Sequence, residues 1–577
     1  MSFEADGTAA MPAGDGYTKG YWQLAVRVAS HASVWLLILT SCIGALARGW
    51  LPVSDDAAIS ARAFQSLTAH PPLIGMLSTA GNLIGVHLYS PGPLQFWLLA
   101  VPVRIDPSHG AFWGSALIAG IALSLAIEAT WSTGIWYACA IVSVAVVDLC
   151  WATPGVFNDL PWNAYLPVPL LIASLGIGWA IARGRIGWWP VLVVCASIAG
   201  QSHLFFLLPG VAIVVVAPAI GIANVGRPQR WRWLVAGIAA GALCWLAPVA
   251  QGVGSNGNLP NLFSSGSSRA TLGIRFGLGM IAHAASLDPL FLRQISTTLG
   301  ILISPSTSGS AGMGLAVVIG LFALTVAALR LKRASFAALS ALTFALCAAT
   351  AVNFALVPLT NRINLSYLSV SVWVVSLAIW ATVLTALAEV VLAARHRALR
   401  RRRSFSQTEQ FHGVDGVSAG KPDESALAPA MSHAAAIVGA MTALVILGLA
   451  TIGAAIPHLT QAPAAGSVIW SSTEISQIVN VTNAIERETH PEPVAFIVVS
   501  HFTSPYAEMR IEEGIAWRLE AAGWHPGLFS IEQTFTGLAL PAHSKFQFAI
   551  VRLNGSHVES VHTVTCRSFV YKACPLL

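Results

Sequence analysis

Long apolar runs recur along the whole chain, and they limit the possible fold more than any other feature. A helix needs about 20 mainly apolar residues to cross a membrane. Eleven stretches meet this need, at residues 28–49, 110–130, 134–151, 165–182, 187–205, 207–225, 231–251, 311–331, 334–357, 366–393 and 432–456. Only 10% of the residues are charged, against roughly 25% in soluble domains. The sequence therefore predicts a polytopic α-helical membrane protein with about 11 transmembrane helices and excludes an ordinary soluble enzyme.

Basic residues gather in short loops next to the apolar runs, which fits membrane orientation better than nucleic-acid binding. With eleven spans, every basic cluster falls on one side, and the positive-inside rule makes that side the cytoplasm. The clusters lie at 183–185, 227–232, 330–333 and 395–403. In a bacterial plasma membrane this predicts a cytoplasmic tail (1–27), a transmembrane domain (28–456) with an outer loop (50–109) and a cytoplasmic linker (394–431), and an extracytoplasmic segment (457–577).

The two outer segments carry different patterns. The pattern of the loop 50–109 predicts two short helices, at about 56–68 and 93–104. The second is too short to span the membrane, so we expect it to lie at the outer membrane surface. Residues 457–577 alternate strand-like and amphipathic stretches, which predicts a small α/β domain. Cys566 and Cys574 lie in this segment. An oxidising compartment would join them in a disulfide.

Two adjacent carboxylates, Asp55 and Asp56, follow the first span directly. Carboxylates at a membrane boundary are costly to bury, so they need cations, hydrogen-bond donors or a reacting partner. A second interpretation is structural, since Asp at a helix N-terminus caps the helix and favours its dipole. The residue pattern alone leaves both interpretations open.

The surroundings of this pair resemble a known family. Asp55-Asp56-Ala57 follows span one, and Pro91-Gly92-Pro93-Leu94 opens the short helix after it. This arrangement is similar to membrane glycosyltransferases of the GT-C superfamily, especially the arabinofuranosyltransferase-like enzymes of the actinobacterial cell envelope. The resemblance covers the first half of the chain.

The resemblance implies a GT-C-like fold and transfer of a sugar from a polyprenyl-phosphate donor to a glycan or glycolipid acceptor at the outer face. Asp55 would be the general base that takes the acceptor's proton, with Asp56 as the reserve candidate. The leaving lipid phosphate needs positive charge. Arg362, at the outer end of a span, and Arg62, two helical turns after Asp55, are the candidates. Arg362 also fits an interfacial arginine that snorkels to the membrane surface.

Other polar residues expected near the outer face complete the predicted substrate site, namely His70, Asp148, Asn163, Gln201 and His203. The trio 201–203 suits either sugar hydroxyls or helix caps, and the polar and aromatic loop around Asn163 suits either carbohydrate or the membrane interface. No cluster has zinc-ligand spacing. No cofactor is required, and a divalent cation near the Asp pair is compatible with the sequence.

Two other functions compete with the transferase. A lipid or sugar transporter or flippase would favour internal repeats and ionisable groups at the midplane, and the chain shows neither pattern. A non-catalytic envelope-assembly partner would use the outer domain to bind membrane or glycan components, and it would be indifferent to the loss of Asp55.

Overall fold

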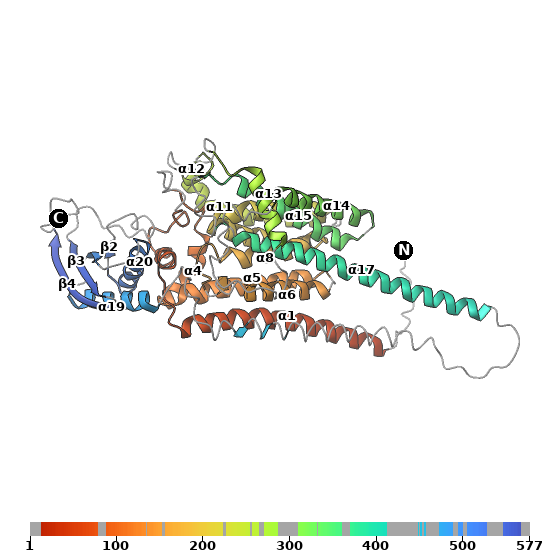
Figure 1. The fold of residues 1–577 in the computed structure, drawn as a ribbon, viewed down its shortest axis with the longest axis horizontal. Coiled ribbons are helices and arrows are strands. Elements are labelled where there is room, and N and C mark those ends of the chain that lie inside the picture. The colour runs from red at the N-terminus through yellow and green to blue at the C-terminus, as the bar shows by residue number, and fades with distance from the viewer. Residues whose placement is uncertain are drawn as a thin grey trace, which may run out of the picture.

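The computed structural model shows a long helical bundle with a small sheet at one end (Figure 1). The structure describes residues 13–78, 88–133, 136–152, 156–157, 159–222, 227–253, 257–264, 270–286, 310–331, 333–359, 368, 370–411, 448, 451–452, 455–456, 472–488, 494–499, 505–524, 526–527, 546–554 and 556–566. Among them, seven helices are long and apolar enough to cross a membrane. The chain is therefore a polytopic membrane protein.

The seven long helices fall on seven of the expected spans. They comprise α1 (Ala13–Ala47), α5 (Gly110–Trp131), α10 (Leu207–Gly221) with the short turn before it, α11 (Arg227–Gly252), α14 (Ala311–Arg330), α15 (Ala334–Ala355) and the first half of α17 (Val370–Phe411). Three further expected spans coincide with shorter apolar helices, α6 (Trp136–Ala152), α8 (Pro167–Ala182) and α9 (Trp189–Ser202). Most of the expected span 432–456 lies outside the described residues.

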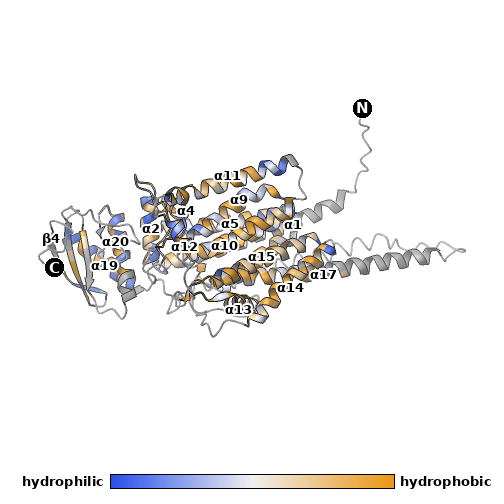
Figure 2. Cartoon of the chain, turned by 90° about the horizontal axis from the view of Figure 1, so that it is seen from above, coloured by the Kyte–Doolittle hydropathy of each residue, from blue (hydrophilic) through white to orange (hydrophobic). Residues whose placement is uncertain are grey.

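Small residues let the helices of the bundle approach closely. A Cβ on Gly277 of α13 (Gly273–Ser286) would lie 2.0 Å from the carbonyl oxygen of Ala351, and one on Gly314 would lie 1.8 Å from that of Leu278. Such contacts are typical of membrane helices, where tight packing replaces the hydrophobic effect. Helices α11 and α14 bury little of their apolar surface against the bundle, and Figure 2 colours much of both helices as hydrophobic, apart from a hydrophilic end of α11. They therefore present apolar faces suited to lipid.

The segment after α1 contains two short helices, α2 (Asp55–Gln65) and α4 (Leu94–Ile105). Both lie close to the ranges predicted from the sequence. Ser54, immediately before α2, has a φ of 51° and is the one non-glycine residue with positive φ among the described residues. Such backbone conformations are costly for residues with a Cβ and concentrate at functional sites. The sharp turn at Ser54 places Asp55 and Asp56 in the first turn of α2.

Beyond the bundle, the chain forms a four-stranded sheet with two helices, α19 (Ser472–Glu488) and α20 (Pro505–Ala521). The strand order is β2-β1-β3-β4, with β1 parallel to β2 and β3, and β3 antiparallel to β4. The strands are β1 (Val494–Val499), β2 (Pro526–Gly527), β3 (Phe546–Asn554) and β4 (His557–Cys566). Figure 1 places α19 and α20 between the sheet and the bundle, so α20 faces the segment that contains α2.

Candidate active site

Asp55 opens α2 with its side chain half-buried. Its Oδ2 accepts a hydrogen bond of 2.7 Å from Nε1 of Trp162. Burial raises the pKa of the Asp55 carboxyl above its ordinary value, and the Trp162 hydrogen bond opposes the shift. An acid with a raised pKa is a better base when ionised, so this environment suits proton transfer.

Asp56 lies deeper, with 1% of its surface exposed. Both carboxylate oxygens are shielded from solvent, and no N–H group among the described residues donates to them. Burial raises the pKa of Asp56 well above the ordinary value, and the nearby carboxyls of Asp159 and Asp55 raise it further. Two buried carboxyls this close favour a state in which they share a proton. We call Asp55, Asp56 and Asp159 the carboxylate cluster.

Aromatic side chains enclose the carboxylate cluster. Trp50 is fully buried and its Nε1 donates to Asp159 Oδ1 at 3.4 Å. Tyr165 is also buried, and the pKa of its hydroxyl is raised by burial and by the charges of Asp159 and Asp56. Trp162 and Tyr165 meet edge to face, with ring centroids 4.6 Å apart. Within this enclosure, the half-buried Asp55 is the member best placed to meet a substrate.

Arg62 also lies on α2, close enough for its charge to act on Tyr89 and on Glu520 of α20. His70 is exposed beyond the end of the helix, where its backbone N–H donates to the Thr68 hydroxyl at 3.3 Å. The structure thus brings Asp55, Asp56 and Arg62 together on one short helix and leaves His70 at the surface.

Gln201 and His203 take part in connections between helices. Gln201 Oε1 accepts from the backbone N–H of Leu94 at 3.4 Å, and its Nε2 donates to the carbonyl of Cys244 at 2.7 Å. His203 Nδ1 accepts from the backbone N–H of Phe205 at 3.3 Å. The neutral imidazole therefore acts here as a helix cap. A role of either residue toward a sugar stays a prediction.

The remaining predicted site residues are less closely tied to the cluster. Asn163 is half-buried and follows Trp162, whose indole N–H donates to Asp55. Asp148 is buried near the end of α6. Arg362 and Cys574 lie outside the described residues, and so does the side chain of Cys566 at the end of β4, so the phosphate contact and the disulfide stay predictions.

Two residues of the site, Asp159 and Trp162, are not among the candidates predicted from the sequence. Their signal was the polar and aromatic composition of the loop between α6 and α8, which is also typical of any membrane interface. Only the fold shows that this loop packs on the first turn of α2.

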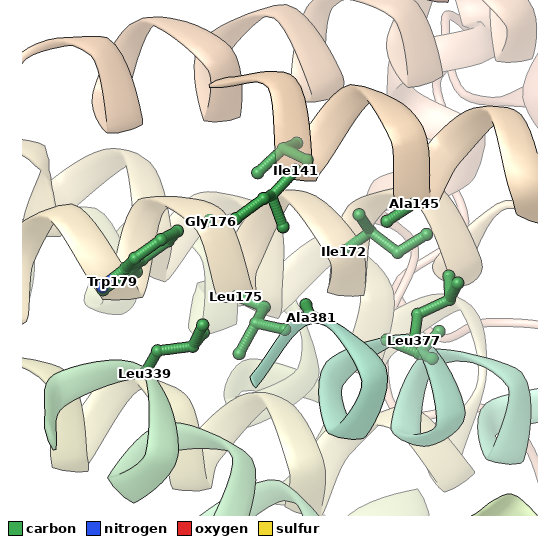
Figure 3. A pocket seen from close by; sticks show the side chains of 11 residues that line it. Ile141, Ala145, Ile172, Leu175, Gly176, Trp179, Leu339, Leu377 and Ala381 are labelled. Carbon is green, nitrogen blue, oxygen red and sulfur yellow. The ribbon is translucent and has the colours of Figure 1, made fainter. Parts of the chain in front are cut away.

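A pocket lies between helices α6, α8, α15 and α17, and its walls are almost wholly apolar (Figure 3). The α8 residues that line it lie between Ile172 and Trp179. They are roughly 7–18 Å along the helix axis from Pro167, which begins α8 on the side of the carboxylate cluster. Its lining suits hydrocarbon and offers no group for sugar chemistry. Among the described residues, no group of three His, Cys, Asp or Glu side chains has the geometry to hold a metal ion.

Comparison with known proteins gives fold likeness alone. No family model and no curated protein matches the chain. ArnT from Cupriavidus metallidurans, bound to undecaprenyl phosphate, is similar with 14% identity and a TM-score of 0.47, covering 92% of this chain and 93% of that one. The archaeal oligosaccharyltransferase AglB from Archaeoglobus fulgidus, in complex with an inhibitory peptide and a dolichol-phosphate, gives 12% identity and a TM-score of 0.30, covering 91% and 65%. Likeness at this level assigns no activity to the chain.

Proposed function

We propose that this protein is a GT-C-type glycosyltransferase of a bacterial plasma membrane. It transfers a sugar from a polyprenyl-phosphate donor to a hydroxyl of a cell-envelope glycan or glycolipid at the outer face. The observation that carries the proposal is the carboxylate cluster, with its half-buried Asp55 held by Trp162 at the start of α2. The resemblance of the Asp55-Asp56-Ala57 and Pro91–Leu94 segments to that family supports the same conclusion.

Asp55 is the general base in this proposal. Its carboxylate removes the proton of the acceptor hydroxyl while the hydroxyl oxygen attacks the anomeric carbon. The bond from that carbon to the phosphate oxygen breaks, and the lipid phosphate leaves with the electron pair. Trp162 fixes one carboxylate oxygen, so the other is free to turn toward the acceptor. Asp56 is the worse candidate, because its carboxyl is buried and its raised pKa favours the protonated form.

Arginine side chains are the proposed partners of the leaving phosphate. Arg362 is expected at the outer end of a span, and Arg62 lies on the same helix as Asp55. A guanidinium stabilises negative charge that develops on phosphate oxygens in the transition state. A divalent cation near Asp55 would serve the same purpose but is not needed for it.

The test is incubation of the purified protein with a panel of polyprenyl-phosphate sugars, including arabinofuranose, mannose, glucose and galactose. Mass spectrometry then measures released lipid phosphate and glycosylated acceptor. Asp55→Asn is compared with Asp106→Asn as a matched control. Oδ1 of Asp106 accepts the backbone N–H groups of Ser108 and His109, and Oδ2 lies 3.4 Å from Nδ1 of His109. An Asn side chain can keep the two hydrogen bonds to Oδ1.

Donor-dependent release by the wild-type protein and by Asp106→Asn, but not by Asp55→Asn, is the expected result. Equal turnover in all three proteins would reject Asp55 as the base. Transport of the lipid across a vesicle membrane without glycosidic bond cleavage would favour the flippase instead.

A further inference from the structure

Helix α20 of the C-terminal segment packs directly on the helix that carries the carboxylates. Trp517 of α20 is buried, meets the ring of Phe64 at a centroid distance of 5.7 Å, and donates from Nε1 to the carbonyl of Pro107 at 3.1 Å. A Cβ on Gly514 would lie 3.4 Å from the carbonyl oxygen of Pro52, three residues before Asp55. Helix α20 thus contacts residues that precede Asp55 and residues that follow Asp56 in the chain.

The polar part of this contact centres on Glu520. Its Oε1 accepts from Nε2 of Gln65 at 3.4 Å. Its Oε2 is buried and accepts no hydrogen bond from any residue that the structure describes. The charged groups that act on Glu520 are Arg62 of α2 and Arg104 of α4. We call Gln65, Arg62, Arg104 and Glu520 the α2–α20 junction.

Arg104 is already engaged within its own segment. Its guanidinium donates to the carbonyl of Phe64 at 2.9 Å and lies 3.7 Å from the centre of the Phe64 ring. The two arginines therefore attract Glu520 without a direct ion pair in the described contacts. The negative charge of an ionised Glu520 is therefore only partly balanced at this position, whereas a protonated Glu520 carries no charge that needs balancing.

We propose that α20 is a proton-sensitive clamp on α2, in which Glu520 is a positioning residue. The protonated carboxyl holds the carboxylate helix in place, and the ionised carboxyl loosens it. The C-terminal domain would thereby regulate the first outer loop. Only the effect on sugar transfer rests on the proposed function; the clamp itself is a property of the fold.

The direction follows from the balance of the forces on Glu520. Burial raises its pKa from an ordinary 4.5 to about 7, against the opposing effects of Gln65, Arg62 and Arg104. A group whose pKa is raised in the docked state stabilises docking fully below its free pKa. That stabilisation is lost as the pH rises through the raised value. Between about pH 5 and pH 8 the docking equilibrium should weaken by on the order of 100-fold.

Hydrogen–deuterium exchange of the full-length protein tests the clamp without any assay of activity. Protection of residues 55–65 and 505–521 is compared at about pH 6 and about pH 8 after correction for intrinsic exchange. The variant Glu520→Gln mimics the protonated carboxyl. Glu559→Gln, at an exposed position on β4, is the matched control. Trp517→Ala removes the apolar contact of α20 with Phe64 and should release the clamp at both pH values.

Wild type and Glu559→Gln should lose protection in both helices at the higher pH, by roughly 10-fold in the exchange rate. Glu520→Gln should keep the protection seen at the lower pH. A loss in Glu520→Gln equal to that of wild type, or a wild type indifferent to pH, would overturn the proposal.

A second measurement separates this proposal from the proposed function. With a donor that supports turnover, the alkaline loss of rate in the wild type should be absent in Glu520→Gln. If exchange follows the expected pattern while no donor is cleaved, the clamp stands and the transferase fails. If a donor is cleaved with identical pH profiles and identical exchange in both proteins, the clamp fails and the transferase stands.

Discussion

The two ends of the helical bundle each contain carboxylates, but the groups that surround these carboxylates differ. At the end remote from α2, Glu128 of α5 accepts from Nε of Arg27 at 2.8 Å, and its second oxygen pairs with the same guanidinium. Nε2 of His31 lies 2.7 Å from the first oxygen. At the other end, roughly 27 Å away along α5, the carboxyl of Asp56 lies near those of Asp55 and Asp159. The indole N–H groups of Trp162 and Trp50 donate to Asp55 and Asp159.

This difference supports a structural role for Glu128 and the proposed catalytic role for Asp55. Glu128 ties α1 to α5 with a bidentate charge-assisted contact, which is the geometry that stabilises. Burial and the nearby carboxyls of Asp159 and Asp55 disfavour the ionised form of Asp56, so Asp56 lowers the stability of the folded state when it is charged. A fold keeps such a cluster when its chemistry requires it. Substitutions at the two ends should therefore have opposite consequences.

The largest effect is expected from Asp55→Asn. Removal of a general base typically lowers turnover by roughly 10²–10⁴-fold. Asn keeps the shape of the side chain and some capping ability, so the protein should still fold. Release of lipid phosphate under saturating donor measures the effect, and the thermal midpoint of the same preparation shows whether folding is intact.

Glu128→Gln should give the reverse pattern at the other end of the bundle. It removes the charge that Arg27 and His31 share, and the loss of charge-assisted hydrogen bonds should lower the free energy of unfolding by about 1–3 kcal/mol. Turnover at a temperature well below the midpoint should stay close to wild type.

The buried free cysteines provide the measurement. Cys42, Cys139, Cys150, Cys195 and Cys347 are all shielded in the folded protein, so a thiol-reactive dye reports their exposure as the bundle unfolds on heating. A Glu128→Gln protein that unfolds like wild type but turns over slowly would invert the comparison.

Asp56→Asn should stabilise the protein. The amide resembles a protonated carboxyl and relieves the repulsion from Asp159 and Asp55. Because the pKa of Asp56 is raised by folding, its ionisation opposes folding more as the pH increases. The gain should be about 1–2 kcal/mol near pH 8 and should disappear in acid, where Asp56 is protonated in the unfolded as well as in the folded wild-type protein. A uniform gain at every pH would show that charge is not the cause.

The sequence was sufficient for the local parts of this picture. The apolar runs predicted the long helices, and the short helices predicted at about 56–68 and 93–104 appear as Asp55–Gln65 and Leu94–Ile105. These features depend on periodicity and turn residues within one segment. The position of Asp55 directly after the first span also follows from local sequence, because the apolar run of that span ends shortly before it.

The sequence could not show which distant residues complete the site. Trp162 is 107 positions from Asp55, and Glu520 is 455 positions from Gln65. Such contacts depend on how the helices of the bundle and the C-terminal segment pack against one another, and local sequence patterns do not show this packing. For the same reason Gln201, a plausible sugar ligand by type, proved to connect α9 with the start of α4 and with α11.

The smallest effect is expected from Trp162→Phe, and it tests how the carboxylate cluster is tuned. Phe keeps the edge-to-face contact with Tyr165 but loses the N–H that donates to Asp55. That hydrogen bond favours the ionised carboxyl, so its loss should raise the pKa of Asp55 further. A general base must be ionised to act, so turnover rises with pH through this pKa. The acid limb of the pH–rate profile should therefore move to higher pH, by about one unit.

Trp245→Phe is the matched control for this last substitution. It also removes an indole N–H donor, in this case to the Ser197 hydroxyl at 3.1 Å, but in a part of the bundle that does not contact Asp55 in the described structure. Its acid limb should coincide with that of wild type. If Trp162→Phe lowers the rate equally at every pH, the indole orients Asp55 without tuning it. If both variants shift alike, the acid limb reports another group, and Asp55 is not the base that limits turnover in acid.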